Sequence, residues 1–419
     1  MAQAASAHDA ARQALYPGSH PAGGMECRLL SGERVAADLA GARLAGEARV
    51  LVAASLGLPA ERVRLVASSG ALEDGAPVGP GGAEAVQACV LPDPLEAELA
   101  AAAGVEDFGE LAGLQALGLP GRRLTALPAA VCRLAGLQKV NLRKNRLSAL
   151  PEGLGDLGSL RTLLLRQNCL AELPESLGRL ACLQTLDVRE NRLAKLPSSI
   201  GQLCALQTLD LEVNCLAALP DGIGQLAALQ TLDVTSNALA VLPESIGQLT
   251  VLQTLNLKQN RLASLPEAVG GLRALRSLDL EANELAALPE GLGELAALRS
   301  LNLAGNELQL LPEAVGRLAA LQLLELSGNR LRALPESLGG LAALQRLRAS
   351  RNALQAAPAS LGHLASLREL DLSQNNLLEL PASFGLLADL QSLQLRGNPL
   401  LAVPEGLGWL QSLGLTVLT

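Results

Sequence analysis

Residues 183–205 read LQTLDVRENRLAKLPSSIGQLCA, and this pattern recurs every 23 residues through most of the chain. Proline keeps the same step from Pro128 to Pro404, which gives thirteen units between about residue 114 and about residue 413. Asparagine keeps it as well, at Asn145, Asn168, Asn191, Asn214, Asn237, Asn260, Asn283, Asn306, Asn329, Asn352, Asn375 and Asn398. A repeat this regular indicates a solenoid, in which similar units stack and bury one shared core.

Each unit divides into a strand, a turn and a return segment. Leu186 and Val188 alternate with polar residues, as in a short strand with one buried face. Asn191 follows where the chain turns, and its amide is suited both to donate to and to accept from backbone groups of the turn. Pro197 suits the start of a short helix, and Gly201 permits close approach of neighbouring backbone. The predicted fold is therefore α/β, with a parallel concave sheet and short convex helices.

The composition limits the core and the partners. The 419-residue chain is 49% hydrophobic, yet its only aromatic residues are Tyr16, Phe108, Phe384 and Trp409. We therefore expect a core of aliphatic layers, with Phe108 and Trp409 covering its two ends. The net charge of −8 argues against nucleic acid as a partner, because the chain has no excess of basic residues to attract phosphates.

The cysteines and the N-terminus indicate a reducing, cytoplasmic environment. Seven cysteines are present, an odd number, and none forms a C-x-x-C pair. We expect Cys169, Cys182, Cys204 and Cys215 to be buried as small apolar residues of the repeats. The first residues lack the basic start and apolar run of a signal peptide, and no apolar run approaches about 18 residues.

The units resemble leucine-rich repeats, whose pattern L-x-x-L-x-L-x-x-N-x-L appears as Leu183, Leu186, Val188, Asn191 and Leu193. The continuation L-P-x-x-Φ-G-x-L, where Φ is apolar, is similar to that of the Ras-group or Shoc-2-like intracellular subclass. This resemblance implies a non-enzymatic signalling scaffold. It also implies protein partners of the kind this subclass has, namely small GTPases or phosphatase and kinase components.

The chain before the repeats predicts a different domain. Residues 25–91 follow the order strand, strand, helix, strand, strand, which is also the order of the β-grasp fold. Within it, Gly57-Leu58-Pro59, Arg64-Leu65-Val66 and Leu72-Glu73-Asp74-Gly75 resemble the central stretch of ubiquitin-like domains. That resemblance implies a small docking patch at Leu30, Val66 and Cys89.

Three further segments complete the predicted domain organisation. Residues 1–24 have no period and a composition typical of disorder. Residues 92–112 carry a helical pattern and are expected to link the domains and to cap the first repeat. The solenoid then occupies residues 113–419.

The sequence predicts no enzyme, no cofactor and no metal site. Its three histidines are His8, His20 and His363, and it contains no H-E-x-x-H, G-x-x-x-x-G-K-[ST] or G-x-S-x-G motif. His363 occupies a convex position that carries Arg, Gln, Asp or Glu in other units, so we expect it to be solvated.

Charge varies along the concave face, at the positions two, four and six residues before each repeated asparagine. A basic N-terminal zone contains Arg143, Arg166 and Arg189, together with Lys139 and Lys144. The acidic middle consists of Asp187, Asp210, Glu212, Asp233, Asp279 and Glu281, and a C-terminal arginine cluster consists of Arg346, Arg348 and Arg351. Strands about 4.8 Å apart stack like charges, and a basic partner would offset their repulsion. We therefore predict that a folded protein docks across the acidic middle and the C-terminal arginine cluster.

Two alternatives remain open from the sequence. The chain could be an adaptor to ubiquitin-pathway proteins or the proteasome that docks through the N-terminal domain. It could also be the regulatory part of a larger enzyme. The sequence leaves the partner, the pathway, the oligomeric state and the regulation open, because repeats define a surface and not its target.

Overall fold

The computed structural model describes residues 27–29, 49, 52–54, 56, 63–67, 70–71, 86–90, 100–101, 103, 111, 113–401 and 416–418. The chain divides into two compact units, residues 1–98 and 99–419. Leu30, Phe108 and Trp409 lie outside the described residues, and so do the roles predicted for them.

The described strands of the first unit form one sheet in the order β1-β4-β2-β3. Their bounds are Cys27–Leu29 for β1, Val63–Ala67 for β2, Gly70–Ala71 for β3 and Val86–Val90 for β4. Strand β1 runs parallel to β4, whereas β4 and β3 are both antiparallel to β2. Val63 and Leu65 of β2 are buried, as are Val52 and Ala53 in a helical segment. Residues 34–40, where the second strand of the predicted order strand, strand, helix, strand, strand would fall, lie outside the described residues.

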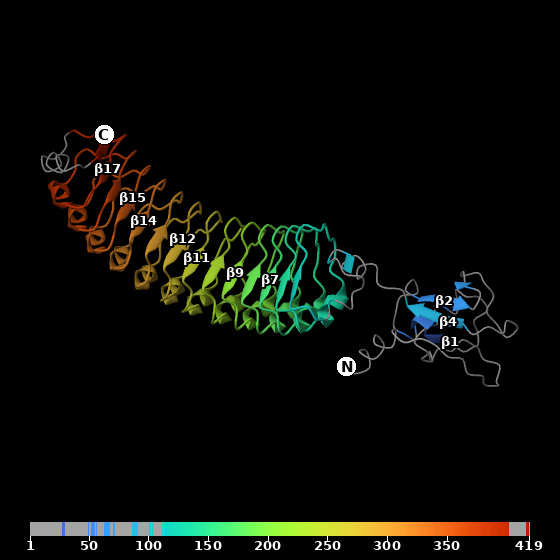
Figure 1. Cartoon of the computed structure of the whole chain (residues 1–419). Helices are drawn as coiled ribbons and strands as arrows, with labels where there is room; N and C mark the ends of the chain where they lie inside the picture. Colours follow the sequence, from blue (N-terminus) through green and yellow to red (C-terminus); the bar gives the residue numbers. More distant parts are fainter. Residues whose placement is uncertain are drawn as a thin grey trace. The chain divides into compact units, whose positions relative to one another are not determined.

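The described strands of the second unit form one parallel sheet in which every strand pairs with its neighbours in sequence (Figure 1). The register advances by one repeat per strand, as in the pairing of Thr231 with Thr254. The strands are β5 Ala116–Gly118, β6 Lys139–Asn141, β7 Thr162–Leu164, β8 Thr185–Asp187, β9 Thr208–Asp210, β10 Thr231–Asp233, β11 Thr254–Asn256, β12 Ser277–Asp279, β13 Ser300–Asn302, β14 Leu323–Glu325, β15 Arg346–Arg348, β16 Glu369–Asp371, β17 Ser392–Gln394 and β18 Thr416–Leu418. This arrangement confirms the predicted solenoid with its parallel sheet.

The return segment of each described repeat is a five-residue 3-10 helix. These helices are η4 Ala129–Arg133, η5 Glu152–Asp156, η6 Glu175–Arg179, η7 Ser198–Gln202, η8 Asp221–Gln225, η9 Glu244–Gln248, η10 Glu267–Gly271, η11 Glu290–Glu294, η12 Glu313–Arg317, η13 Glu336–Gly340, η14 Ala359–His363 and η15 Ala382–Leu386. The repeated proline directly precedes each helix in an extended conformation, as Pro197 does with φ −62° and ψ 146°. The proline therefore ends the preceding segment rather than forming the first helical turn.

The core is a stack of aliphatic layers, as predicted. Leu186, Val188, Leu193, Ile200 and Leu203 of one repeat are all fully buried, and the equivalent residues of its neighbours continue the stack. Burial of each such side chain stabilises the fold by about 1.5–3 kcal/mol relative to exposure. At the N-terminal end of the array Leu111 belongs to this core, and Ala103 packs against it.

The repeated asparagines join each repeat to the one before it. Asn191 is the clearest example. Its Nδ2 donates to the carbonyl oxygens of Leu165 at 3.1 Å and Val188 at 2.9 Å, and its Oδ1 accepts from the Leu170 N–H at 3.0 Å. An unpaired buried backbone group costs about 1–3 kcal/mol, so each amide removes several such penalties. The predicted role of these asparagines is confirmed.

The repeated glycines permit close contact between adjacent 3-10 helices. A Cβ placed on Gly224 would lie 2.3 Å from the carbonyl oxygen of Ser245 in the next repeat. A Cβ on Gly201 would lie 2.3 Å from the carbonyl oxygen of Gly222. Close approach is therefore the reason for glycine at these positions.

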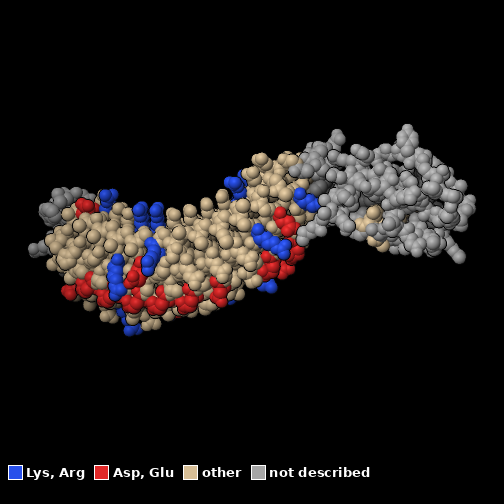
Figure 2. Space-filling model, turned by 90° about the horizontal axis from the view of Figure 1, so that it is seen from below, with Lys and Arg blue, Asp and Glu red and all other residues tan. Residues whose placement is uncertain are grey.

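Several carboxylates on the outer side bridge successive helices. We call the acidic residues that begin these helices the outer carboxylates: Glu152, Glu175, Asp221, Glu244, Glu267, Glu290, Glu313 and Glu336. Glu175 accepts hydrogen bonds from the N–H groups of Ser198 at 2.9 Å and Ser199 at 3.0 Å in the next repeat. Backbone hydrogen bonds from these two residues lower the pKa of Glu175. Figure 2 shows acidic side chains in a row along the array.

The prediction that the repeat cysteines are buried is wrong for three of them. Cys182, Cys204 and Cys215 are exposed, and Cys169 is half-buried. Their positions lie in connecting segments outside the aliphatic layers. The position of Cys215 carries Arg192 in one repeat and Arg261 in another, which identifies it as a surface position.

Candidate partner-binding face

The last residue of most strands has a structural role that the sequence analysis did not predict. Its side-chain oxygen accepts the backbone N–H two residues later, as Asp233 does from Thr235 at 2.9 Å and Asp279 does from Glu281 at 2.9 Å. Asn256 makes the same turn with Lys258 at 3.2 Å. Aspartate and asparagine both favour this local turn. Acids recur at this position partly because the last strand residue must accept this N–H. Asn256 and Asn302 make the same hydrogen bond without a charge, and their presence in the sequence was the sign of this structural role.

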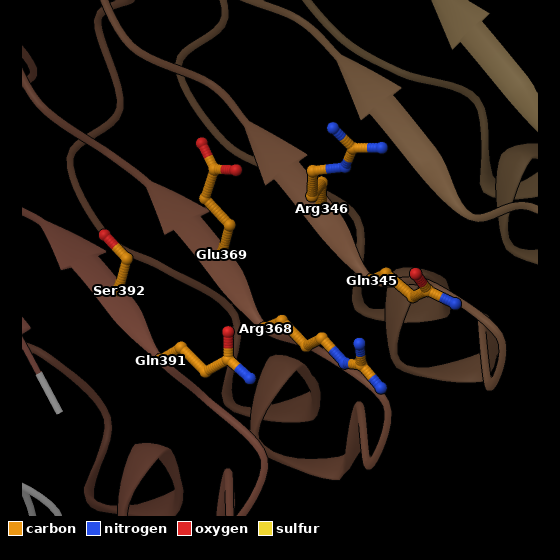
Figure 3. Close-up of a pocket in the computed structure, with 6 residues that line it drawn as sticks. All are labelled: Gln345, Arg346, Arg368, Glu369, Gln391 and Ser392. Carbon is orange, nitrogen blue, oxygen red and sulfur yellow. The ribbon is translucent and has the colours of Figure 1, made fainter. Parts of the chain in front are cut away.

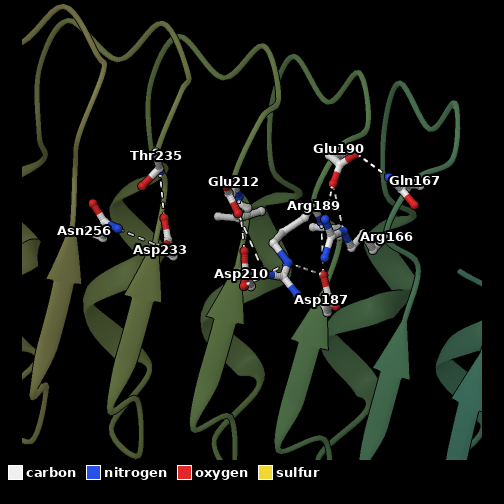
Figure 4. A network of polar contacts seen from close by, with 12 residues as sticks. Arg166, Gln167, Asp187, Arg189, Glu190, Asp210, Glu212, Asp233, Thr235 and Asn256 are labelled. Atoms are coloured by element: carbon white, nitrogen blue, oxygen red, sulfur yellow. Dashed lines mark hydrogen bonds and ion pairs between the residues drawn. The ribbon is translucent and has the colours of Figure 1, made fainter. Parts of the chain in front are cut away.

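An ion network joins the basic N-terminal zone to the acidic middle (Figure 4). Asp187 is almost fully buried and accepts hydrogen bonds from the guanidinium groups of Arg143 and Arg189. Arg189 also lies 3.2 Å from Asp210 and 3.7 Å from Glu212. The network holds these side chains in fixed positions on the sheet.

Two aspartates at equivalent positions of this network have opposite pKa shifts. Burial raises the pKa of Asp187, but hydrogen bonds from Arg189 and Arg143 outweigh that effect, and the net pKa is lowered. Burial raises the pKa of Asp210 to about 6, because the attraction of Arg189 is too weak to offset it. The carboxylates of Asp233 and Asp187 make smaller contributions to this rise in the pKa of Asp210. The difference comes from the number of arginine hydrogen bonds each carboxylate receives.

The remainder of the acidic middle is less neutralised. Asp233 accepts from the Asn256 amide at 3.1 Å, and neither Asp233 nor Asp279 forms an ion pair with any residue that the structure describes. Glu281 pairs with Lys258 at 2.8 Å. Asp233 and Asp279 are half-buried, so their charge is held at the sheet surface and remains available to a partner.

The two basic regions differ in how much of their charge is compensated. Arg143 binds Asp187, and Arg166 binds Glu190, an acid that the sequence analysis did not select. In the C-terminal arginine cluster Arg348 pairs with Glu369 at 2.8 Å and with Glu325 at 3.7 Å. Arg351 donates to the neutral Gln374 at 2.9 Å. Arg143, Arg166 and Arg189 of the basic N-terminal zone thus all bind acids, whereas in the C-terminal arginine cluster only Arg348 does so among the described residues.

The patch predicted on the first unit is described only in part. Residue 66 lies in β2 opposite Gln87, and residue 89 lies in β4 opposite Arg64. By this register, positions 66 and 89 occur on the same face of the sheet, opposite to that of Val63 and Leu65.

The described residues include no group of three or more His, Cys, Asp or Glu side chains placed to hold a metal ion. His363 is exposed, as expected. No helix in the described part of the chain has the length and apolar character needed to cross a membrane.

Comparison with known families matches residues 152–241, 232–304 and 289–372 to the leucine-rich repeat region, and residues 355–400 to the leucine rich repeat. A comparison with curated proteins gives no match.

Several solved structures are similar to this chain. A leucine-rich repeat protein of Leptospira interrogans is 33% identical with a TM-score of 0.65, over 74% of this chain and 86% of that one. The Arabidopsis receptor kinase HAESA, solved with the peptide hormone IDA and the co-receptor SERK1, is 27% identical with a TM-score of 0.56, over 74% and 58%. An internalin from Listeria monocytogenes, 20% identical with a TM-score of 0.64 over 78% and 97%, shares the fold alone. Proteins of this kind generally act as scaffolds for protein interactions, and the chain belongs to the leucine-rich repeat family.

Proposed function

We propose that the chain is a non-enzymatic scaffold of intracellular signalling that binds a partner protein on its concave face. The observation that carries this proposal is the charge of Asp233 and Asp279, which form no ion pair with any described residue, beside an ordered ion network. Fixed charges of one sign on a rigid surface favour a partner of opposite charge, because little side-chain ordering remains to be done on binding.

The test removes charge without removing the turn. The reversal of Asp to Lys is a poor test, because lysine cannot accept the backbone N–H that these aspartates hold. The variant Asp233→Asn/Asp279→Asn keeps the turn, since Asn256 and Asn302 make it naturally. Proteins captured from a cell extract by the full chain are identified by mass spectrometry, and those bound by the acidic middle are expected to be lost from the variant.

A matched control removes the same number of negative charges from a different surface of the array. Asp221→Asn/Glu244→Gln removes two negative charges from the outer side and should capture the same proteins as wild type. Equal capture by all three proteins would contradict binding at the acidic middle. Thermal unfolding of each variant separates loss of binding from loss of the fold.

The resemblance to the Ras-group subclass supports a cytoplasmic location and a small GTPase, or phosphatase and kinase components, as the partner. The peptide hormone present in the solved receptor kinase structure supports protein or peptide ligands for this repeat surface in general terms. The captured proteins decide between these classes.

A second candidate function is that of an adaptor to the ubiquitin pathway, with residues 25–91 as a ubiquitin-like domain and residues 113–419 as the solenoid. The parallel pairing of β1 with β4, the first and last described strands of that unit, favours it. Positions 66 and 89 share one face there, as a patch requires. Val66→Asp should then release ubiquitin-pathway proteins while partners of the concave face remain bound.

A further inference from the structure

A shallow hollow of about 470 Å³ lies where strands β15, β16 and β17 begin (Figure 3). Its lining residues come from three successive repeats. They are Gln345, Arg346, Arg368, Glu369, Gln391 and Ser392. In each pair the first residue directly precedes the strand and the second is the first residue of the strand.

The scaffold does not require arginine at either position. The residue before the strand is glutamine in most repeats, as at Gln345 and Gln391, and its backbone carbonyl makes the contacts to the next repeat. The first strand residue is usually threonine or serine, as at Thr254 and Ser392. Arg346 and Arg368 therefore add positive charge that the fold itself does not use.

These two arginines retain their charge at the surface. Both are exposed, and neither forms an ion pair with any of the residues that the structure describes. Glu369, the acid in the hollow, is occupied by Arg348, whose Nε lies 2.8 Å from it. The hollow thus presents two free guanidinium groups, with amides and a hydroxyl from Gln345, Gln391 and Ser392 around them.

We propose that this hollow binds carboxylate side chains of an acidic segment of the partner protein. The inference rests on the proposed function, because it supplies the ligand chemistry for one part of the concave face. A guanidinium group donates two parallel hydrogen bonds to a carboxylate, and the neutral lining groups supply further polar contacts. Glu369 also lines the hollow, and although Arg348 pairs with it, its negative charge disfavours a doubly charged phosphate more than a singly charged carboxylate.

The probe is a rhodamine-labelled peptide, Gly-Glu-Glu-Gly-Glu-Glu-Gly, and its binding to the full chain is followed by fluorescence anisotropy at low salt. The test variant is Arg346→Ser/Arg368→Gln, which gives both positions the residues of other repeats. Its affinity should fall about fivefold to thirtyfold, because two exposed ion pairs are lost. Wild-type binding should weaken as salt rises.

A control variant tests the location of the site. Arg276→Gln/Arg299→Gln removes two exposed arginines from the same position in repeats whose strands begin with serine. This control should bind the peptide like wild type. A loss in the control that equals the loss in the test variant would overturn the assignment.

Two further peptides test the ligand chemistry. A peptide with Gln in place of Glu should bind at least about fivefold more weakly to wild type. Equal binding of the two peptides would overturn the inference, and so would tighter binding of a phosphoserine peptide that disappears in the test variant. None of these outcomes bears on the capture of proteins by the acidic middle, so failure here and failure of the proposed function are distinguishable.

Discussion

At the scale of single residues, Asp210 shows how environment changes a repeated position. Burial raises its pKa from 3.8 to about 6, so the folded chain holds this proton more tightly than the unfolded chain. The resulting stabilisation is complete below about pH 4 and is lost as pH rises through about 6. Wild type should therefore lose about 1–2 kcal/mol of unfolding free energy relative to Asp210→Asn between about pH 4.5 and pH 7.5.

Urea unfolding of both proteins at the two pH values measures this difference. Asn at position 210 keeps the acceptor for the Glu212 N–H, so the turn itself is unchanged. Asp187 provides a contrast of opposite sign. The lowered pKa of Asp187 stabilises the fold at pH values above the pKa that this group has in the unfolded chain. This stabilisation is lost as the pH falls through the folded-state pKa. Parallel stability profiles for wild type and Asp210→Asn would contradict the assignment.

The sequence predicted both aspartates as members of one acidic column but not their difference. Asp187 and Asp210 occupy the same place in adjacent repeats. Only the structure shows that Arg143 reaches across two repeats to Asp187 and has no such contact with Asp210. Because Arg143 and Asp187 are 44 residues apart in the sequence, no local pattern predicts their contact.

At the scale of the elements, adjacent 3-10 helices depend on the glycines between them. Gly224→Ala places a Cβ 2.3 Å from the Ser245 carbonyl oxygen, so the two helices must separate. We expect a destabilisation of about 1–3 kcal/mol, as for other overpacked contacts. Gly158→Ala is the matched control, because nothing lies within 4 Å of the Cβ it would introduce. Thermal melts should show a lowered midpoint for Gly224→Ala only.

The regular part of each element could be predicted, because the 23-residue step gives strand, asparagine turn and return segment at once. The irregular part could not. The sequence suggested that proline begins the helix, whereas Pro197 precedes it. No sequence pattern indicates that Glu175 accepts hydrogen bonds from the Ser198 and Ser199 N–H groups of the next helix. Both features depend on a neighbouring repeat that the periodicity alone does not describe.

At the scale of the whole molecule, the acidic middle and the C-terminal arginine cluster are separated by complete repeats. Deletion of residues 290–312 joins Pro289 to Glu313 and restores the proline-to-helix junction found elsewhere. Because each repeat contacts mainly its neighbours, the shortened array should fold. The two charged regions then approach by one strand spacing of about 4.8 Å.

The deletion separates the two proposals. A single protein that spans both regions should bind the shortened chain more weakly than wild type, whereas the acidic peptide should bind it unchanged. Calorimetric titration with a captured partner measures the first effect, and anisotropy measures the second. A peptide affinity that changes with the deletion would contradict an independent hollow at Arg346 and Arg368.

The direction of the bonds between repeats has a consequence for synthesis on the ribosome. Asn191 reaches back to groups of the preceding repeat, and the Ser198 N–H reaches back to a waiting Glu175. Each repeat that leaves the ribosome thus supplies the asparagine amide that satisfies the backbone groups of the preceding repeat. The array is therefore suited to co-translational folding, in which each repeat folds onto the preceding one, beginning with the first.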